Sequence, residues 1–104
     1  MALAPLIYVM FSSAIFAVGI YVLATKRNLI KQLIGIELLI NAAHLNFVSF
    51  AASNPVGLDP YAISFVLLSL GAGAAIIAVA ILLAVHVYRQ YGTLDLDQLR
   101  RLRR

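Results

Sequence analysis

The chain of 104 residues is 63% hydrophobic and only 12% charged, far below the roughly 25% of charged residues in typical soluble domains. With a mean hydropathy of +0.99, it has too few polar residues to coat a soluble core, so we expect one membrane domain over residues 1–104. The absence of cysteine excludes disulfides and thiolate-ligated metal sites. The formal net charge of +4 comes mainly from one short connection and from the C-terminal tail.

Three apolar stretches are long enough to cross a bilayer as helices, which takes about 20 residues each. They cover residues 3–24, 29–52 and 61–88. A short polar connection separates the first two, and a turn rich in proline and glycine separates the second from the third. The sequence therefore predicts an all-α integral membrane fold with three transmembrane helices.

The basic residues predict how this fold is oriented in the membrane. Lys26 and Arg27 lie in the first connection, the tail at 89–104 carries five arginines, and the second connection has none. Because Lys and Arg are enriched on the cytoplasmic side, the N-terminus is predicted to be outside and the C-terminus cytoplasmic. We expect the tail to be a solvated basic arm that lies against anionic lipid or a neighbouring subunit. Nucleic-acid binding is not expected, since no soluble domain accompanies these charges.

The second span contains Glu37, the only carboxylate predicted to lie within the bilayer. A single acidic side chain in an apolar helix costs roughly 2.5–3.5 kcal/mol on insertion scales, and such residues often mark ion or proton paths. We therefore favour a role in proton transfer for Glu37. The alternative is a structural role, in which Glu37 pairs with a cation on another subunit and fixes the helix register.

Asn41 and His44 follow Glu37 at helical spacing, four and seven residues further on. All three fall within about 40° of one helix face and span about 10 Å along the axis. A path from Glu37 to His44 would therefore need Asn41 or a water between them. For His44 a hydrogen bond between helices is a simpler role than proton transfer. An asparagine such as Asn41 likewise more often joins helices than relays protons.

The third span is predicted mainly to pack against other helices. Its small residues Gly71, Ala74, Ala75 and Ala78 share one face, and small residues allow close approach of helix backbones in lipid. The alternative to a packing role is a functional one, in which the helix widens locally into a π-bulge at Gly71 to Gly73.

The basic connection Lys26-Arg27-Asn28-Leu29-Ile30, followed by Leu33-Ile34-Gly35-Ile36-Glu37-Leu38-Leu39-Ile40-Asn41, is a specific combination. It resembles subunit K (4L in mitochondria) of proton-pumping NADH–quinone oxidoreductase, respiratory complex I. The resemblance extends over nearly the whole chain, including Thr93-Leu94-Asp95-Leu96-Asp97 in the tail. It implies a multi-pass protein of a prokaryotic plasma membrane or an organellar energy-converting membrane. It also implies that Glu37, and no other residue, takes the family's role in proton transfer; Asn41 and His44 are further candidates only because they share its helix face.

The same resemblance implies what the subunit binds. We expect it to have no catalytic redox site, cofactor or metal of its own, whereas the whole complex uses quinone and NADH or another electron donor. The expected partners are other membrane subunits of the complex, including antiporter-like subunits, and the lipid bilayer.

Two positions depart from the family pattern. Most members have a second glutamate in the third helix, where this chain has Ala74, and His44 stands where Asn or a small residue is common. One hypothesis is that His44 supplies the titratable group that the third helix lacks. The other is that the chain belongs to a complex I-related hydrogenase, ferredoxin-linked dehydrogenase or cation/proton antiporter. A small multidrug-type exporter also has one essential buried Glu, but it has four spans and carries that Glu in the first.

Overall fold

In the computed structural model, residues 3–53 and 56–101 are described, and these residues form four helices. They are α1 (Leu3–Thr25), α2 (Leu29–Ala52), α3 (Pro60–Tyr91) and the short α4 (Leu96–Arg100). The first three are long and apolar enough to cross a membrane. This confirms the prediction of an all-α fold with three candidate spans, while the side of the membrane on which each terminus lies stays a prediction.

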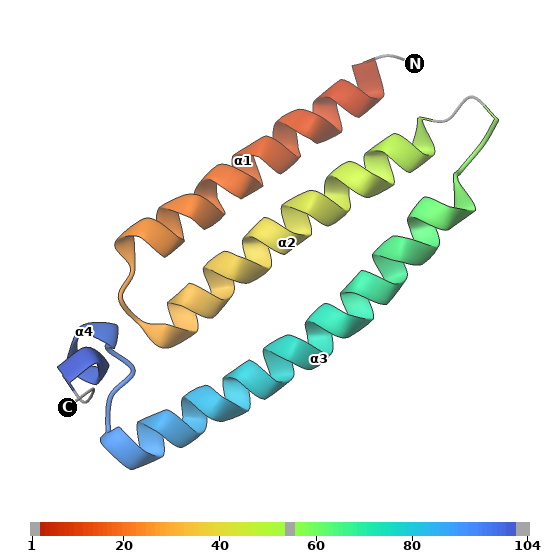
Figure 1. Cartoon of the computed structure of the whole chain (residues 1–104). Coiled ribbons are helices and arrows are strands. Elements are labelled where there is room, and N and C mark those ends of the chain that lie inside the picture. The colour runs from red at the N-terminus through yellow and green to blue at the C-terminus, as the bar shows by residue number, and fades with distance from the viewer. Residues whose placement is uncertain (1–2, 54–55, 102–104) are drawn as a thin grey trace.

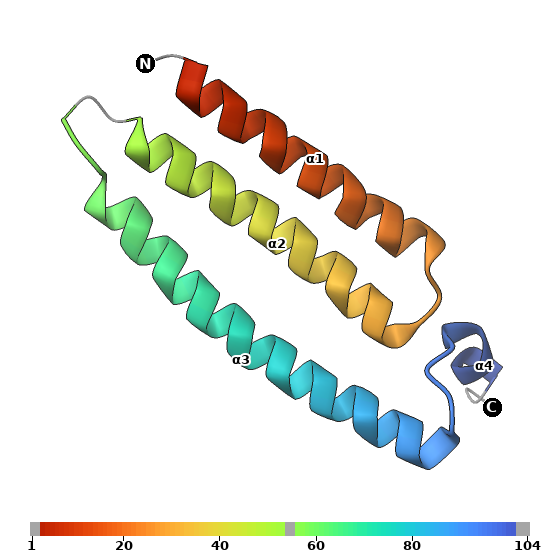
Figure 2. The ribbon, with the colours of Figure 1, turned by 180° about the vertical axis from the view of Figure 1, so that it is seen from behind.

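The three long helices lie side by side, with α2 between α1 and α3 (Figures 1 and 2). Consecutive helices run antiparallel. As a result α2 has two packed faces, whereas α1 and α3 each have only one within the chain. Large apolar side chains elsewhere on them are exposed, for example Met10, Leu68 and Leu82. Such surfaces are suited to lipid tails or to the helices of other subunits.

Local capping groups set the ends of α2 and α3. The Asn28 side chain accepts hydrogen bonds from the backbone N–H groups of Ile30 and Lys31 at the start of α2. Asp59 caps α3 in the same way, with Pro60 in its first turn, and Gly92 ends the helix in the left-handed region at φ 73°. Because nothing interrupts α3 before Gly92, residues 89–91 belong to the helix and not to the tail. The third helix is therefore longer than the predicted span of 61–88.

Two glycines allow α1 and α2 to pack closely. A Cβ atom added to Gly19 would lie 2.8 Å from Leu39 Cδ2 and 3.1 Å from the backbone oxygen of Gly35. A Cβ atom added to Gly35 would lie 3.0 Å from Leu23 Cγ. Such close approach of backbones is how helices associate in lipid, where hydrophobicity alone gives no preference for helix contacts.

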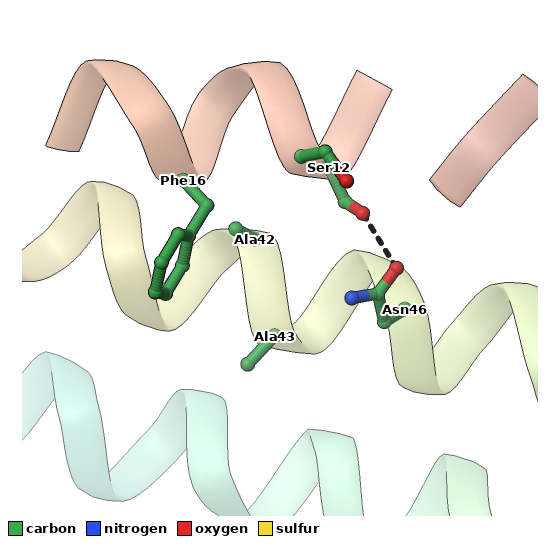
Figure 3. A pocket seen from close by; sticks show the side chains of 6 residues that line it. Ser12, Phe16, Ala42, Ala43 and Asn46 are labelled. Atoms are coloured by element: carbon green, nitrogen blue, oxygen red, sulfur yellow. Dashed lines mark hydrogen bonds between the residues drawn. The ribbon is translucent and has the colours of Figure 1, made fainter. Parts of the chain in front are cut away.

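A polar pair also joins α1 to α2, nearer the start of α1 and the end of α2 (Figure 3). The Ser12 hydroxyl donates to Asn46 Oδ1 at 2.5 Å, with Val9 O as an alternative acceptor at 2.9 Å. Ser12 is fully buried, and the pair borders a cavity of about 240 Å³ that Phe16 and Ala42 also line. Asn46 lies opposite Glu37 on α2 because nine residues separate them along the helix, so the two side chains face different neighbouring helices.

We expect the Ser12–Asn46 bond to contribute modestly to the stability of the helix pair. Hydrogen bonds between transmembrane helices average about 0.6 kcal/mol and reach about 1.7 kcal/mol in double-mutant cycles. A cycle of Ser12→Ala and Asn46→Ala, measured by unfolding the purified subunit in detergent micelles, should give a coupling energy in that range. Ser13→Ala, which changes an exposed neighbour, is the control and should not couple to Asn46→Ala.

The described part of the tail folds back onto the connection between α1 and α2. Two backbone hydrogen bonds join them, from Leu29 N to Leu94 O at 2.9 Å and from Leu96 N to Arg27 O at 2.7 Å. Arg27 Nη1 also lies 3.2 Å from Asp97 Oδ1. Asp95 caps α4 by accepting from the backbone N–H of Asp97. Residues 94–97 are therefore held against the chain itself, which the prediction of a solvated arm did not include.

Candidate functional site

Glu37 lies on the face of α2 that is directed towards α3. It borders a cavity of about 110 Å³ whose other lining residues are all aliphatic, contributed by α2 and α3: Ile30, Leu33, Ile34, Ile77 and Ile81. The side chain is half-buried. No residue in the described part of the chain gives it a hydrogen bond or an ion pair.

The register of the two helices explains this position. Residues 30, 33, 37 and 44 recur at the spacing of one helical face, and Ile77 and Ile81 do the same on α3. Because the helices are antiparallel, Glu37 lies level with Ile77, and the Phe47 and Phe65 rings meet further along at a centroid distance of 5.1 Å. A carboxylate held in such an apolar cavity is costly unless it is protonated or paired.

His44 lies on the same face and is buried, with 8% of its surface exposed. Its Nε2 atom is 2.6 Å from Ser69 Oγ of α3, which confirms the interpretation of His44 as a hydrogen-bonding residue between helices. Its Nδ1 atom is buried and has no hydrogen-bond partner among the described residues. In either neutral tautomer one ring nitrogen donates and the other accepts, so among the described residues one hydrogen-bonding group of the imidazole is left unsatisfied.

Asn41 is exposed at the edge of this face. The described residues show no hydrogen bond among Glu37, Asn41 and His44, so the structure brings the three to one side of α2 without connecting them. The seven residues from Glu37 to His44 correspond to about 10 Å along the helix. A proton would need a water or a group from another subunit to cross that distance.

The small residues of α3 do not pack against α2. Gly71, Ala74, Ala75 and Ala78 are all exposed, and a Cβ atom added to Gly71 would meet nothing within 4 Å. Their predicted packing role would therefore have to involve a helix from another chain. Ala74, where the resemblance led us to expect a glutamate, belongs to this exposed face.

The bond between Ser69 and His44 was not predicted, because in the sequence Ser69 indicates only a small residue that pairs with Gly73 in helix packing. Ser69 was one of a few polar residues in an apolar span, and matching polar positions between antiparallel helices would have paired it with His44. Across residues 3–53 and 56–101, no group of three or more His, Asp or Glu side chains is placed to hold a metal ion.

Comparisons with known proteins assign the chain to a family. The model of the family described as NADH-ubiquinone/plastoquinone oxidoreductase chain 4L matches residues 7–104. NADH-quinone oxidoreductase subunit K of Brevibacillus brevis is 33% identical over 99 residues, covering 93% of each chain. NAD(P)H-quinone oxidoreductase subunit 4L of Synechocystis is 35% identical over 88 residues, covering 84% of each. The chloroplastic NAD(P)H-quinone oxidoreductase subunit 4L of Chlorokybus atmophyticus is 33% identical, over 89% of this chain and 91% of its own.

The family model covers the sequence almost from end to end. The described residues also form three apolar helices that are long enough to span a membrane. The chain is a multi-pass membrane protein and belongs to the chain 4L family of NADH-ubiquinone/plastoquinone oxidoreductases.

Proposed function

We propose that this chain is a membrane-arm subunit of a proton-translocating NADH–quinone oxidoreductase, in which Glu37 transfers protons along a path coupled to quinone reduction. The observation that carries the proposal is the half-buried Glu37 carboxyl in an aliphatic cavity between α2 and α3, without a partner in the described chain. A group in that position can exchange a proton with a neighbour at hydrogen-bond range, because no ion pair with the residues that the structure describes fixes its charge.

In this proposal the subunit contributes residues to the proton path and holds no redox cofactor. Electron donor and quinone are substrates of the whole complex and bind on other subunits. The relatives' names include the quinone oxidoreductase of which they are subunits, and the exposed apolar faces of α1 and α3 fit contacts with further membrane subunits, among them antiporter-like ones.

The experiment that tests the role of Glu37 is its replacement by glutamine in the assembled complex. Glutamine keeps the size and much of the hydrogen-bonding capacity of the side chain but cannot titrate. Quinone reduction and proton translocation should both fall, and the relay proposal fails if both are unchanged.

We propose that His44 is a second proton-transfer residue. It would replace the third-helix glutamate that the resemblance implies, because this chain has Ala74 at that position. The support for this role is the buried Nδ1 atom, which has no hydrogen-bond partner among the described residues. We expect His44→Asn to lower proton translocation about a hundredfold or more, the low end of what a positioned proton-transfer group contributes. The matched control is Ser69→Ala, which removes the bond to Nε2 and leaves the imidazole.

Both measurements are made on complexes with equal subunit content in sealed vesicles. A His44→Asn complex that translocates protons like the wild type would show that His44 serves only to join α2 to α3.

The N-terminus is proposed to lie outside and the C-terminus in the cytoplasm. In support, the first connection and residues 94–97 are hydrogen-bonded together at one end of the molecule, so both basic segments fall on the same side. Because the chain has no cysteine, single cysteines at Val56 and Arg101 can report this directly. A membrane-impermeant thiol reagent added to intact cells should label the Val56→Cys chain and not the Arg101→Cys chain, and the reverse result would invert the orientation.

A further inference from the structure

A second polar cavity lies at the other end of α2 from the Ser12–Asn46 pair, where the tail meets the connection between α1 and α2. Its volume is about 400 Å³, and we call it the loop pocket. Three basic residues line it, Lys26, Arg27 and Arg100, together with one acidic residue, Asp97. Leu23 of α1 and Leu96 of α4 form an apolar part of the wall.

The fold of the tail creates this concentration of charge. The hydrogen bonds of Leu29 to Leu94 and of Leu96 to Arg27 hold α4 against the connection, which brings Arg100 into the same pocket as Lys26. Asp97 pairs with Arg27 at 3.2 Å. Within the described residues, neither Lys26 nor Arg100 has a carboxylate partner, so the loop pocket carries a surplus of positive charge.

The other polar groups at the end of α1 do not offset this charge. Gln32 Nε2 donates to the backbone oxygens of Leu23 at 3.0 Å and of Lys26 at 2.5 Å. The Gln32 amide therefore satisfies these two carbonyl oxygens, so they do not need a hydrogen bond from Lys26 or Arg100. The basic groups of those two residues remain available for an anion. The Lys26 ammonium lies 5.8 Å from the centre of the Tyr21 ring.

The position of the loop pocket along α1 matches the level of lipid headgroups. A helix of 23 residues is about 35 Å long, somewhat longer than the hydrocarbon core of about 30 Å. The end of α1 and the start of α2 therefore emerge among the phosphate groups, and a tyrosine such as Tyr21 is a typical residue of that layer.

We infer that the loop pocket binds the phosphate group of an anionic phospholipid, through Lys26 and Arg100, with the start of its acyl chains against Leu23 and Leu96. Arginine and lysine bind phosphate oxygens through charge-assisted hydrogen bonds, and basic clusters next to membrane helices attract anionic lipids. An aliphatic wall beside the charges favours a lipid over a free anion. This inference is independent of the proton-transfer role of Glu37.

The test uses the complex that contains this subunit, reconstituted in phosphatidylcholine nanodiscs with a photoactivatable analogue of either phosphatidylglycerol or phosphatidylcholine. Peptide mapping after irradiation should find the phosphatidylglycerol label enriched over the phosphatidylcholine label at residues 23–27 and 94–101. Lys26→Gln and Arg100→Gln should each lower this enrichment about fivefold. Arg100→Lys, which keeps the charge, should retain most of it.

Lys31→Gln is the matched control, because Lys31 is a nearby exposed basic residue that does not line the loop pocket. Equal labelling by the two lipid analogues, or an equal effect of Lys31→Gln and Arg100→Gln, would overturn the inference. Binding of inorganic phosphate to the loop pocket without enrichment of the phosphatidylglycerol label would instead assign the loop pocket to free phosphate. A carbodiimide cross-link from Lys26 to an acidic residue of another subunit, without lipid labelling, would assign it to a protein contact.

Discussion

Replacing Glu37 by glutamine is expected to leave the complex assembled and to lower proton translocation by about a hundredfold or more, the range over which positioned acid–base groups act. The side chain borders an aliphatic cavity and has no partner in the described chain, so glutamine removes the titrating proton while disturbing little packing. Quinone reduction should fall as well, since the two processes are coupled in the proposed function. The measurement is the rate of both processes in sealed vesicles.

Glu37→Asp is the control for this prediction. Aspartate keeps the titratable group but is shorter by one methylene, so it should retain more activity than glutamine. Equal losses for the two variants would indicate that the length of the side chain matters and not its proton. Full activity of Glu37→Gln would support the alternative of a structural glutamate.

Gly19→Val is expected to destabilise the subunit by separating α1 from α2. The added Cβ atom would lie 2.8 Å from Leu39 Cδ2 and 3.1 Å from the Gly35 carbonyl oxygen. Leu39 can move, but the backbone of Gly35 cannot without shifting the helix. Overpacking of this kind typically costs about 1–3 kcal/mol, which unfolding of the purified subunit in detergent micelles can measure.

Gly71→Val is the matched control, because an added Cβ atom at Gly71 meets nothing within 4 Å in the chain. In the isolated subunit it should have little effect beyond the helix propensity of the residue. In the assembled complex it reports whether the exposed small residues of α3 pack against another subunit. Equal destabilisation of the isolated chain by both variants would contradict the packing of Gly19 against α2.

The sequence was sufficient to predict the three helices, because length and hydropathy decide which segments can cross a bilayer. It also predicted that Glu37 and His44 share a face of α2, which follows from helical periodicity. The partner of each face could not be derived in this way. Periodicity does not state that Asn46 meets Ser12 on α1, or that His44 meets Ser69 on α3.

The sequence pattern also did not predict how the tail folds. Residues 94–97 join the first connection through backbone hydrogen bonds, and such bonds leave no trace in hydrophobic periodicity. The small residues of α3 show a related limit. Their pattern predicts close helix packing, but it does not distinguish a helix of the same chain from one of another subunit.

The most direct test of the central claim is whether the Glu37 carboxyl changes its protonation during turnover. Infrared difference spectroscopy of the complex, comparing its oxidised and quinone-reducing states, detects the C=O stretch of a protonated carboxylic acid. The proposed function predicts a carboxylic-acid band that appears or disappears in the wild-type difference spectrum and is missing from that of Glu37→Gln. Identical carboxyl bands in the two spectra would contradict it, since Glu37 would then neither gain nor lose a proton.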